Sequence, residues 1–243
     1  MSASPNAAPD YVRNQLLRQL RSGDLELLLP RLEKVTLDLK QVIQQAGATI
    51  DHIYFVESGT VSMISSLADG SQAEVGLAGR EGLVGLPLLL GSPVATLDAL
   101  VQVSGTARRM AAEPFRRALT EVPFLRDTLL RYVNVFHLQV AQTAVCNSWH
   151  PIDQRLARWI LMTADRAENE QFPMTQDFMS RMLGVQRPGV NIAARRLSRA
   201  GLISQERGWL TLLDRPRLES AACECYSLVR NQFDALFASH AET

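Results

Sequence analysis

The sequence predicts an α+β protein: an N-terminal antiparallel β-barrel or jelly roll with flanking helices, a long helix, and a C-terminal domain of short helices and a hairpin. Three observations support this prediction. Residues 32–110 consist of short β-rich runs punctuated by glycines, residues 124–147 are apolar at helical spacing without glycine or proline, and residues 151–213 return to short amphipathic segments. Strands and helices differ in the period of their apolar residues, which is 2 for strands and 3.6 for helices.

The β-rich region contains a clear hairpin signal. The run Ile53–Val56 is followed by Glu57-Ser58-Gly59, and the run Thr60–Ser65 is followed by Ala68-Asp69-Gly70. An Asp-Gly pair between two strand-like runs is typical of a tight β-hairpin. Several short strands at this spacing predict a small antiparallel barrel or sandwich.

Four further segments have the spacing of amphipathic helices: Tyr11–Leu29, Glu113–Thr120, Phe124–Asn147 and Ile152–Ala167. The third is long for a small protein, and its apolar residues recur every three or four positions, as in a stripe that faces a partner. We expect it to be a dimerisation helix; the alternative is a core helix of one globular domain. The expected interface residues are Leu125, Leu129, Tyr132, Phe136 and Val140.

Residues 175–201 are the most informative part of the chain. Thr175–Leu183 is a short helix with Thr175 as its cap, Gly184-Val185-Gln186 is a three-residue turn, and Arg187–Ala200 is a second helix that Gly201 ends. Two helices joined by a tight glycine turn form a helix-turn-helix. The run Leu202–Leu213 that follows predicts a two-stranded wing with Arg207-Gly208 near its tip.

The charge of this region differs from that of the whole chain. The formal net charge of the 243 residues is zero, yet eight arginines between Arg181 and Arg217 face only Glu206 and Asp214, which leaves a local net charge of +6. A basic module in a neutral chain indicates binding of a polyanion. The alternative function is a ligand-binding signalling protein that acts through a protein partner. An electroneutral protein partner would need no such charge, which argues against this alternative.

The outer face of the second helix carries the expected DNA contacts. Arg187, near the helix N-terminus, can donate two hydrogen bonds to guanine O6 and N7, worth roughly 1–3 kcal/mol of discrimination. Ile192 can contact a thymine methyl group, and a wing arginine can contact phosphates. The full predicted set is Thr175, Gln176, Gln186, Arg187, Gly189, Asn191, Ile192, Arg195, Arg196 and Arg207.

The order of these motifs resembles that of a known family. The segments Ile53–Val61, Asp69-Gly70 and Gly82–Gly85, followed about a hundred residues later by Gly184–Val190, resemble the strands, glycines and recognition-helix start of the Crp/Fnr family. This resemblance implies a sequence-specific transcription regulator, a homodimer with recognition helices in successive major grooves, and a roughly palindromic operator in double-stranded DNA. It leaves RNA polymerase open as a further partner.

The resemblance also implies a division of the chain. We expect a flexible N-terminus at 1–15, a cyclic-nucleotide-binding-like effector domain at 16–122, the dimerisation helix at 123–150, a winged helix-turn-helix domain at 151–220 and a helical tail at 221–243. The apolar run Gly82–Leu90 is far shorter than the roughly 20 residues of a membrane helix, and residues 1–10 lack the features of a signal peptide. We therefore expect a cytoplasmic protein with no membrane contact.

The effector region departs from the family pattern. In members that bind cyclic nucleotides, a glutamate follows the glycine equivalent to Gly85, and an arginine about ten residues later binds the cyclic phosphate. Here Leu86 follows that glycine, and residues 88–101 contain no arginine. Arg80, which precedes Gly85, is a poor substitute. A buried phosphate without a counter-charge is costly, so we expect a signal other than cyclic AMP. The corresponding residues are Gly85, Leu86, Pro87, Thr96 and Leu97, which either line an apolar effector pocket or, the interpretation we favour, simply fill the barrel.

We expect no bound metal or cofactor. No cysteine precedes Cys146, which argues against the iron–sulfur centre of the oxygen-sensing branch; haem stays open, with His52 and His137 as candidate ligands. Cys146, Cys223 and Cys225 have no framework spacing, so free thiols are favoured over a redox switch or a metal site. The histidines, at 52, 137, 150 and 240, form no zinc-site spacing.

An enzyme is the remaining rival. A cupin-like metal site needs two or three histidines and a carboxylate inside the barrel, whereas residues 32–110 contain only His52. No pairing of a nucleophile with a base is evident in the sequence, so we expect no catalytic residues.

Overall fold

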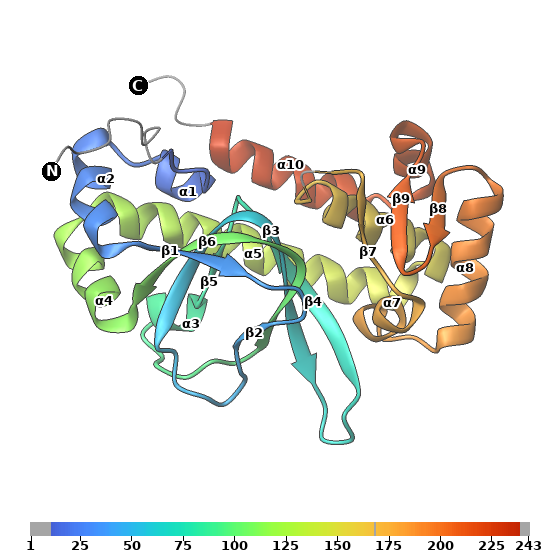
Figure 1. The fold of residues 1–243 in the computed structure, drawn as a ribbon, viewed down its shortest axis with the longest axis horizontal. Coiled ribbons are helices and arrows are strands. Elements are labelled where there is room, and N and C mark those ends of the chain that lie inside the picture. Colours follow the sequence, from blue (N-terminus) through green and yellow to red (C-terminus); the bar gives the residue numbers. More distant parts are fainter. Residues whose placement is uncertain (1–10, 168, 239–243) are drawn as a thin grey trace, which may run out of the picture.

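The structure is a computed structural model that describes residues 11–167 and 169–238, so the first ten residues of the predicted flexible N-terminus, and His240, lie outside it (Figure 1). An N-terminal β domain lies against the long helix α5, and a domain of short helices with a small sheet lies at the far end of that helix. Among the described residues, no helix is both long enough and apolar enough to cross a membrane.

The N-terminal helical segment is shorter and more broken than predicted. It consists of α1 (Gln15–Arg18), α2 (Ser22–Leu28) and a 3-10 turn, η1 (Leu29–Arg31). The Asn14 side chain accepts hydrogen bonds from the backbone N–H groups of Leu16 and Leu17, which starts α1. Arg21 is extended, with φ −61° and ψ 150°, so the chain leaves the helix and starts a new one.

The β domain is a six-stranded antiparallel sheet in the order β1-β6-β3-β4, with β2 paired to β6 and β5 paired to β3. The predicted α+β class with an N-terminal antiparallel β domain is confirmed, although the path of paired strands is open rather than closed into a barrel. The strands are β1 (Glu33–Leu37), β2 (Val42–Gln44), β3 (His52–Ser66), β4 (Gln72–Ala78), β5 (Leu83–Val84) and β6 (Asp98–Ala111).

Strand β3 continues through the point where the sequence predicted a break. Gly59 has φ +80°, and the register of β3 against β6 shifts on either side of it. A Cβ on Gly59 would lie 2.5 Å from the Val103 carbonyl oxygen, and one on Gly105 would lie 2.1 Å from the Ser58 carbonyl oxygen. Both glycines therefore permit a close backbone approach, and the Glu57-Ser58-Gly59 segment bulges within the strand instead of ending it.

Helix α3 (Leu86–Leu89) precedes β6, and α4 (Ala112–Glu121) leads into α5 (Pro123–Trp149), whose first residue is a proline, as suits a first helical turn. The structure corrects the predicted dimer stripe. Four of its residues are buried in the core of the same chain and the fifth packs against that core, so they are not available to a partner: Leu125, Leu129, Tyr132, Phe136 and Val140.

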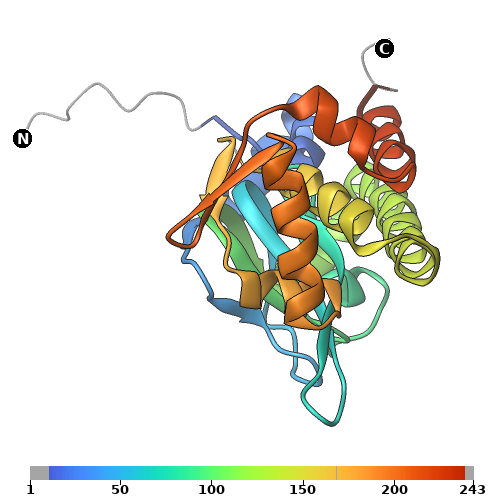
Figure 2. The ribbon, with the colours of Figure 1, turned by 90° about the vertical axis from the view of Figure 1, so that its right-hand side faces the viewer.

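The C-terminal domain contains the predicted pair of helices and one strand more than predicted. Its sheet is three-stranded, in the order β7-β9-β8. Helix α10 then turns back along α5 to the N-terminal helices, where the Gln19 side-chain amide donates to the Leu236 carbonyl at 3.0 Å (Figures 1 and 2). The elements are α6 (Ile152–Ala164), β7 (Gln171–Pro173), α7 (Gln176–Leu183), α8 (Arg187–Arg199), β8 (Ile203–Glu206), β9 (Trp209–Leu212), α9 (Arg215–Ala221) and α10 (Cys225–Ala238).

Helix α6 docks the C-terminal domain on the sheet of the same chain. Ile64 and Leu77 of the sheet belong to the apolar core of the C-terminal domain. Three polar contacts cross the same junction: the Trp159 indole donates to Glu74 at 2.7 Å, the Gln102 amide donates to Thr163 at 3.0 Å, and the Arg166 guanidinium donates to Glu81 at 2.7 Å. The two domains therefore share a buried polar interface.

Candidate nucleic-acid interface

The turn between α7 and α8 is set by local hydrogen bonds. The Thr175 hydroxyl accepts from the Phe178 N–H at 3.2 Å and caps α7. Gly184 ends that helix in the left-handed region, at φ +62°, and the Val185 N–H donates to the Ser180 carbonyl at 3.0 Å. A side chain at φ +62° is strained, which explains the glycine at this position.

The inner face of α8 packs against α7. Val190, Ala193, Ala194 and Leu197 are buried, and they belong to one apolar cluster with residues of α7. Gly189 serves the same packing rather than an exposed contact, because a Cβ there would lie 3.0 Å from the Ile152 side chain of α6. Helix α8 is therefore held rigidly, and its opposite face is presented to solvent.

That opposite face combines unpaired positive charge with an apolar side chain. Arg187, Arg195 and Arg199 are exposed, and no acidic group of the described chain pairs with them. Ile192 is 55% exposed. Arg196 differs, because it forms an ion pair with Asp153 at 3.3 Å.

Three polar residues of the predicted set border this face. Gln186 is exposed at the N-cap of α8 and makes no side-chain capping hydrogen bond. Asn191 is half-buried, and its Oδ1 atom has no hydrogen-bond partner in the described chain. Gln176 is half-buried in the first turn of α7.

The wing is a tight hairpin. Glu206 pairs with Trp209, so Arg207 and Gly208 form a two-residue loop with φ values of +49° and +84°. Positive φ at both positions is the conformation that two-residue hairpins favour. Strand β7 pairs with β9 and anchors the wing, and the Gly208 carbonyl accepts from the Met174 N–H at 2.7 Å. The Arg207 side chain is exposed at the tip.

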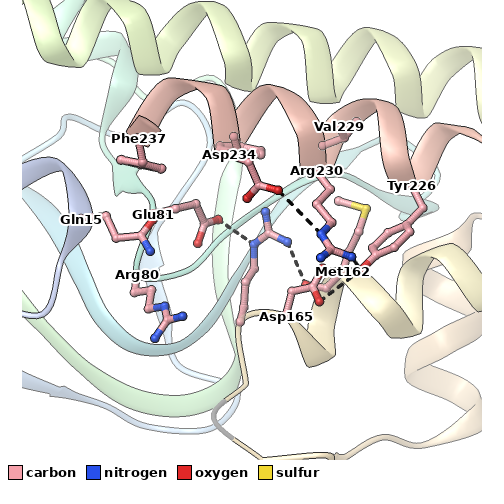
Figure 3. A pocket seen from close by; sticks show the side chains of 12 residues that line it. Gln15, Arg80, Glu81, Met162, Asp165, Tyr226, Val229, Arg230, Asp234 and Phe237 are labelled. Carbon is pink, nitrogen blue, oxygen red and sulfur yellow. Dashed lines mark hydrogen bonds and ion pairs between the residues drawn. The ribbon is translucent and has the colours of Figure 1, made fainter. Parts of the chain in front are cut away.

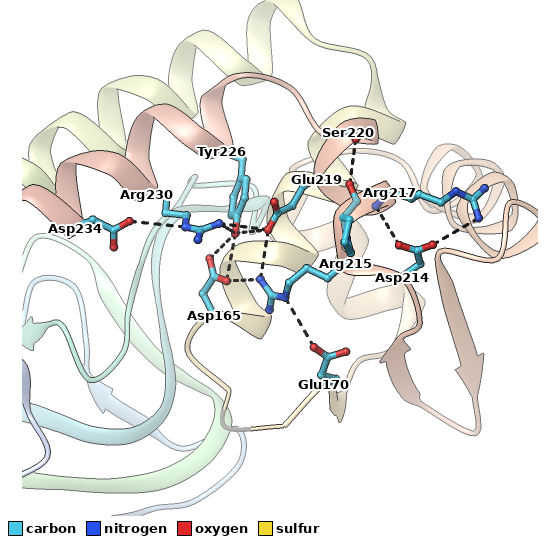
Figure 4. A network of polar contacts seen from close by, with 11 residues as sticks. Asp165, Glu170, Asp214, Arg215, Arg217, Glu219, Ser220, Tyr226, Arg230 and Asp234 are labelled. Atoms are coloured by element: carbon cyan, nitrogen blue, oxygen red, sulfur yellow. Dashed lines mark hydrogen bonds and ion pairs between the residues drawn. The ribbon is translucent and has the colours of Figure 1, made fainter.

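Two arginines of α9, which follows the wing in the chain, are neutralised. Arg215 pairs with Asp165 at 2.7 Å and lies 3.8 Å from both Glu170 and Glu219, while Arg217 pairs with Asp214 at 3.7 Å (Figure 4). The local net charge counted along the sequence therefore overstates the free charge. The arginines of this region without an acidic partner in the described chain are Arg187, Arg195, Arg199 and Arg207.

The predicted effector residues are mainly packing residues. Gly85 has φ +106°, and a Cβ on it would lie 2.7 Å from the Ile53 side chain. Leu86 and Leu97 pack against the core of the β domain, Pro87 is half-buried and Thr96 is exposed. The segment after Gly85 therefore behaves as an apolar turn that fills the domain.

Arg80 lies at a different cavity, of about 150 Å³, which α10 covers (Figure 3). The same cavity is lined by Gln15 of α1, by Glu81, which follows Arg80 in the chain, and by Asp165, which follows α6. Of the two candidate haem ligands, His52 lies half-buried at the start of β3, and His137 is exposed on α5.

Comparisons with known proteins place this geometry in a family. Residues 34–121 match the cyclic nucleotide-binding domain, and residues 154–221 match the Crp-like helix-turn-helix domain. The chain belongs to the Crp/Fnr family. The matched helix-turn-helix supports DNA binding, and members of this family of transcription regulators are generally dimeric. Among curated proteins, none matches the sequence significantly.

Solved structures of Crp/Fnr regulators share the fold at low identity. FixK2 from Bradyrhizobium japonicum aligns with a TM-score of 0.67 and 16% identity, covering 79% of this chain and 98% of its own. The c-di-GMP-responsive global regulator CLP of Xanthomonas campestris aligns at 0.63 with 16% identity, covering 80% of this chain and 100% of its own. A CRP-family regulator from Thermus thermophilus aligns at 0.62 with 19% identity, covering 77% and 96%.

Proposed function

We propose that this Crp/Fnr protein is a sequence-specific DNA-binding regulator that inserts α8 into the major groove and acts in the cytoplasm. The observation that carries the proposal is the outer face of α8, where Arg187, Arg195 and Arg199 are exposed without acidic partners. A surface that binds a protein would carry fewer unpaired arginines. The same observation therefore favours DNA over the protein-partner alternative.

The contacts divide into base reading and positioning. Arg187 lies in the first turn of α8, where a side chain can donate to guanine O6 and N7. Ile192, about one turn later on the exposed face, suits a thymine methyl group. Arg207 at the wing tip lies in the position of a phosphate contact, which adds affinity but carries no sequence information.

The homodimer in this proposal uses the exposed side of α5. The side of α5 that faces away from the sheet carries an apolar stripe whose neighbouring members lie three, four or eight residues apart, spacings that return to the same face of a helix. Trp149, at the end of the helix, is 81% exposed. The stripe consists of Leu130, Leu138, Ala141, Val145 and Trp149.

The signal in this proposal is not cyclic AMP. The apolar Leu86 stands in place of the glutamate that follows the glycine in nucleotide-binding members, and its side chain packs against the core. The side chain that would balance a cyclic phosphate is absent from residues 88–101. Burial of an unbalanced phosphate here would cost several kcal/mol.

The test is a mobility-shift measurement on a palindromic duplex library across a range of salt concentrations. The double variant R187A/R195A should bind duplex at least tenfold more weakly, and its affinity should fall less steeply with salt because fewer counterions are released. The matched control, R116A/R117A, removes the same charge from α4 and should bind like the wild type. Absence of duplex binding by the wild type at low salt would refute the proposal.

A further inference from the structure

Four potential metal ligands from two distant segments meet beside the junction of α5 and α6. Cys146 lies in the last turn of α5 and His150 follows the helix. Cys223 lies in the connection between α9 and α10, and Cys225 is the first residue of α10. One donor atom from each residue lies within 4.8 Å of all the others. The three cysteines are buried and form no disulfide, and His150 is half-buried.

Two distances within this cluster are close to those of a tetrahedral zinc site. Zinc–sulfur bonds of about 2.3 Å and zinc–nitrogen bonds of about 2.0–2.1 Å place two sulfurs roughly 3.8 Å apart, and a sulfur and a nitrogen roughly 3.5 Å apart. The Sγ atoms of Cys146 and Cys223 are 3.5 Å apart, and Cys225 Sγ lies 3.5 Å from His150 Nδ1. The donors are thus already gathered around a space of the size of a single ion.

We infer that Cys146, His150, Cys223 and Cys225 bind one Zn²⁺ ion per chain. Three cysteines and one histidine are among the donor sets of structural zinc sites. The ion joins the end of α5 to the start of α10, and its binding releases the thiol protons to solvent. This inference is independent of the proposed DNA binding.

The surroundings of His150 orient its ring for this role. His150 Nε2 lies 3.4 Å from a carboxylate oxygen of Glu224, which leaves Nδ1 directed toward the sulfurs. A carboxylate that holds the far nitrogen of a ligand histidine is a recurrent support of zinc sites. On the opposite side, the Gln142 amide donates to Cys225 Sγ at 3.1 Å, which favours the thiolate form of that ligand.

Two buried arginines balance the charge of such a site. Three thiolates and one Zn²⁺ ion carry a net charge of −1, and Arg155 and Arg158 of α6 both act electrostatically on the cysteines. Both arginines are buried, and the Nε atom of each has no hydrogen-bond partner in the described chain. A buried cation is stabilised by a nearby anion, which the metal-bound thiolates supply.

The site lies where it can hold the DNA-binding domain. The Arg155 guanidinium donates to the Leu183 carbonyl at the end of α7, directly before the turn to α8. Arg158 donates to Thr143 of α5 at 3.0 Å. The ion therefore fastens the segment that connects the long helix to the helix-turn-helix.

The first experiment measures metal on the full-length wild-type chain. Protein purified in reducing buffer is analysed for metal by mass spectrometry, stripped with a chelator and titrated with Co²⁺. We expect one Zn²⁺ per chain before stripping, and visible Co²⁺ absorption with thiolate charge-transfer bands that Zn²⁺ then abolishes. Zinc at a hundredfold excess over its Kd should raise the thermal unfolding midpoint by roughly 5–10 °C.

Variants locate the site. C223S/C225S should lose at least 100-fold in Co²⁺ affinity and show no zinc-dependent rise in the unfolding midpoint. E224Q should lose roughly tenfold, since supporting residues contribute 10–100-fold to metal affinity. The matched control H137A removes an exposed histidine of α5, the helix that carries Cys146, and should bind Co²⁺ like the wild type.

Three results would overturn the inference. The first is reduced wild-type protein with three titratable thiols, no metal and no Co²⁺ absorption, which would leave the cluster as free thiols or a disulfide pair. The second is unchanged Co²⁺ affinity in C223S/C225S, which would place the metal elsewhere. The third is iron with inorganic sulfide in stoichiometric amount, which would identify a cluster instead of a single ion.

Discussion

The outer face of α8 and the turn after Gly85 correspond to the two positions where a Crp/Fnr regulator meets its ligands, and they are built in opposite ways. The α8 face presents unpaired arginines on a rigidly packed helix. The turn after Gly85 instead directs leucines into the core. Unpaired exposed charge on a fixed element is the feature of a binding surface, whereas apolar packing is the feature of a structural segment. The comparison shows unpaired exposed charge at the first position and apolar packing within the domain at the second.

The largest effect is expected from Gly85→Ala. The φ of +106° strains any side chain, and the new Cβ would lie 2.7 Å from Ile53, so the free energy of unfolding should fall by about 2–4 kcal/mol. Urea denaturation measures it. Gly91→Ala is the matched control, because it shares the positive φ of +90° but has no atom within 4 Å of the new Cβ. Equal losses in the two variants would show that the turn is not tightly packed.

The next effect concerns a contact between the β domain and the C-terminal domain, which joins Glu74 of β4 to Trp159 of α6. Burial raises the pKa of Glu74 from its ordinary value of 4.5 to about 7. The folded chain therefore holds a proton that the unfolded chain has lost between pH 4.5 and 7, so stability falls as pH rises through this window and is constant above it. The decrease amounts to roughly 3 kcal/mol at most.

Glu74→Gln should remove this dependence. The amide keeps an oxygen for the Trp159 indole, which now donates to Glu74 at 2.7 Å, and carries no charge at any pH. We expect the variant to be more stable than the wild type at pH 8 and nearly equal to it at pH 5, as measured by thermal unfolding across pH. A variant with the same pH profile as the wild type would assign the dependence to other groups.

A smaller effect, on binding alone, is expected from Arg187→Ala. The loss of two hydrogen bonds to guanine should cost about 1–3 kcal/mol at one base pair of the selected site and leave stability within about 0.5 kcal/mol. Binding-site selection on a random duplex library measures the first, and urea denaturation the second. A variant that selects the wild-type motif with uniformly weaker affinity would make Arg187 a phosphate contact.

The smallest effect is expected from cyclic AMP. Because Leu86 and Leu97 pack against the core and residues 88–101 supply no arginine to balance a cyclic phosphate, the nucleotide should change duplex affinity less than twofold. Titration of the mobility shift with cyclic AMP, with cyclic GMP in parallel, provides the measurement. A strong cyclic AMP dependence would show that another cation, such as Arg80, balances the phosphate.

Local sequence signals predicted the DNA-binding unit closely. The Thr175 cap, the Gly184 turn and the apolar residues of α8 act within a few residues of one another, so the two helices lie within one residue of their expected ends. Strand β7 escaped prediction because its three residues include Pro173 and its structure depends on pairing with β9.

Sequence signals whose meaning depends on contacts with distant residues predicted the structure less well. The periodic stripe on α5 revealed an amphipathic helix but not what covers its apolar side. Helices α4 and α10 and strand β4 of the same chain pack against it. Likewise, the count of arginines could not show that Asp165, which lies before the counted segment, neutralises Arg215. In both cases the missing information was which distant residue lies opposite.

By itself, the sequence determined the fold class, the family and the helix-turn-helix, because caps, turn glycines and apolar periods act over short stretches of chain. Only the tertiary structure decided which face of α5 is exposed, which arginines are unpaired, and that Cys146 and His150 meet Cys223 and Cys225. The sulfurs of Cys146 and Cys223 are 77 residues apart in sequence and 3.5 Å apart in space. The spacing of these residues along the chain does not indicate that they lie close together, because the packing of α10 against α5 brings them together.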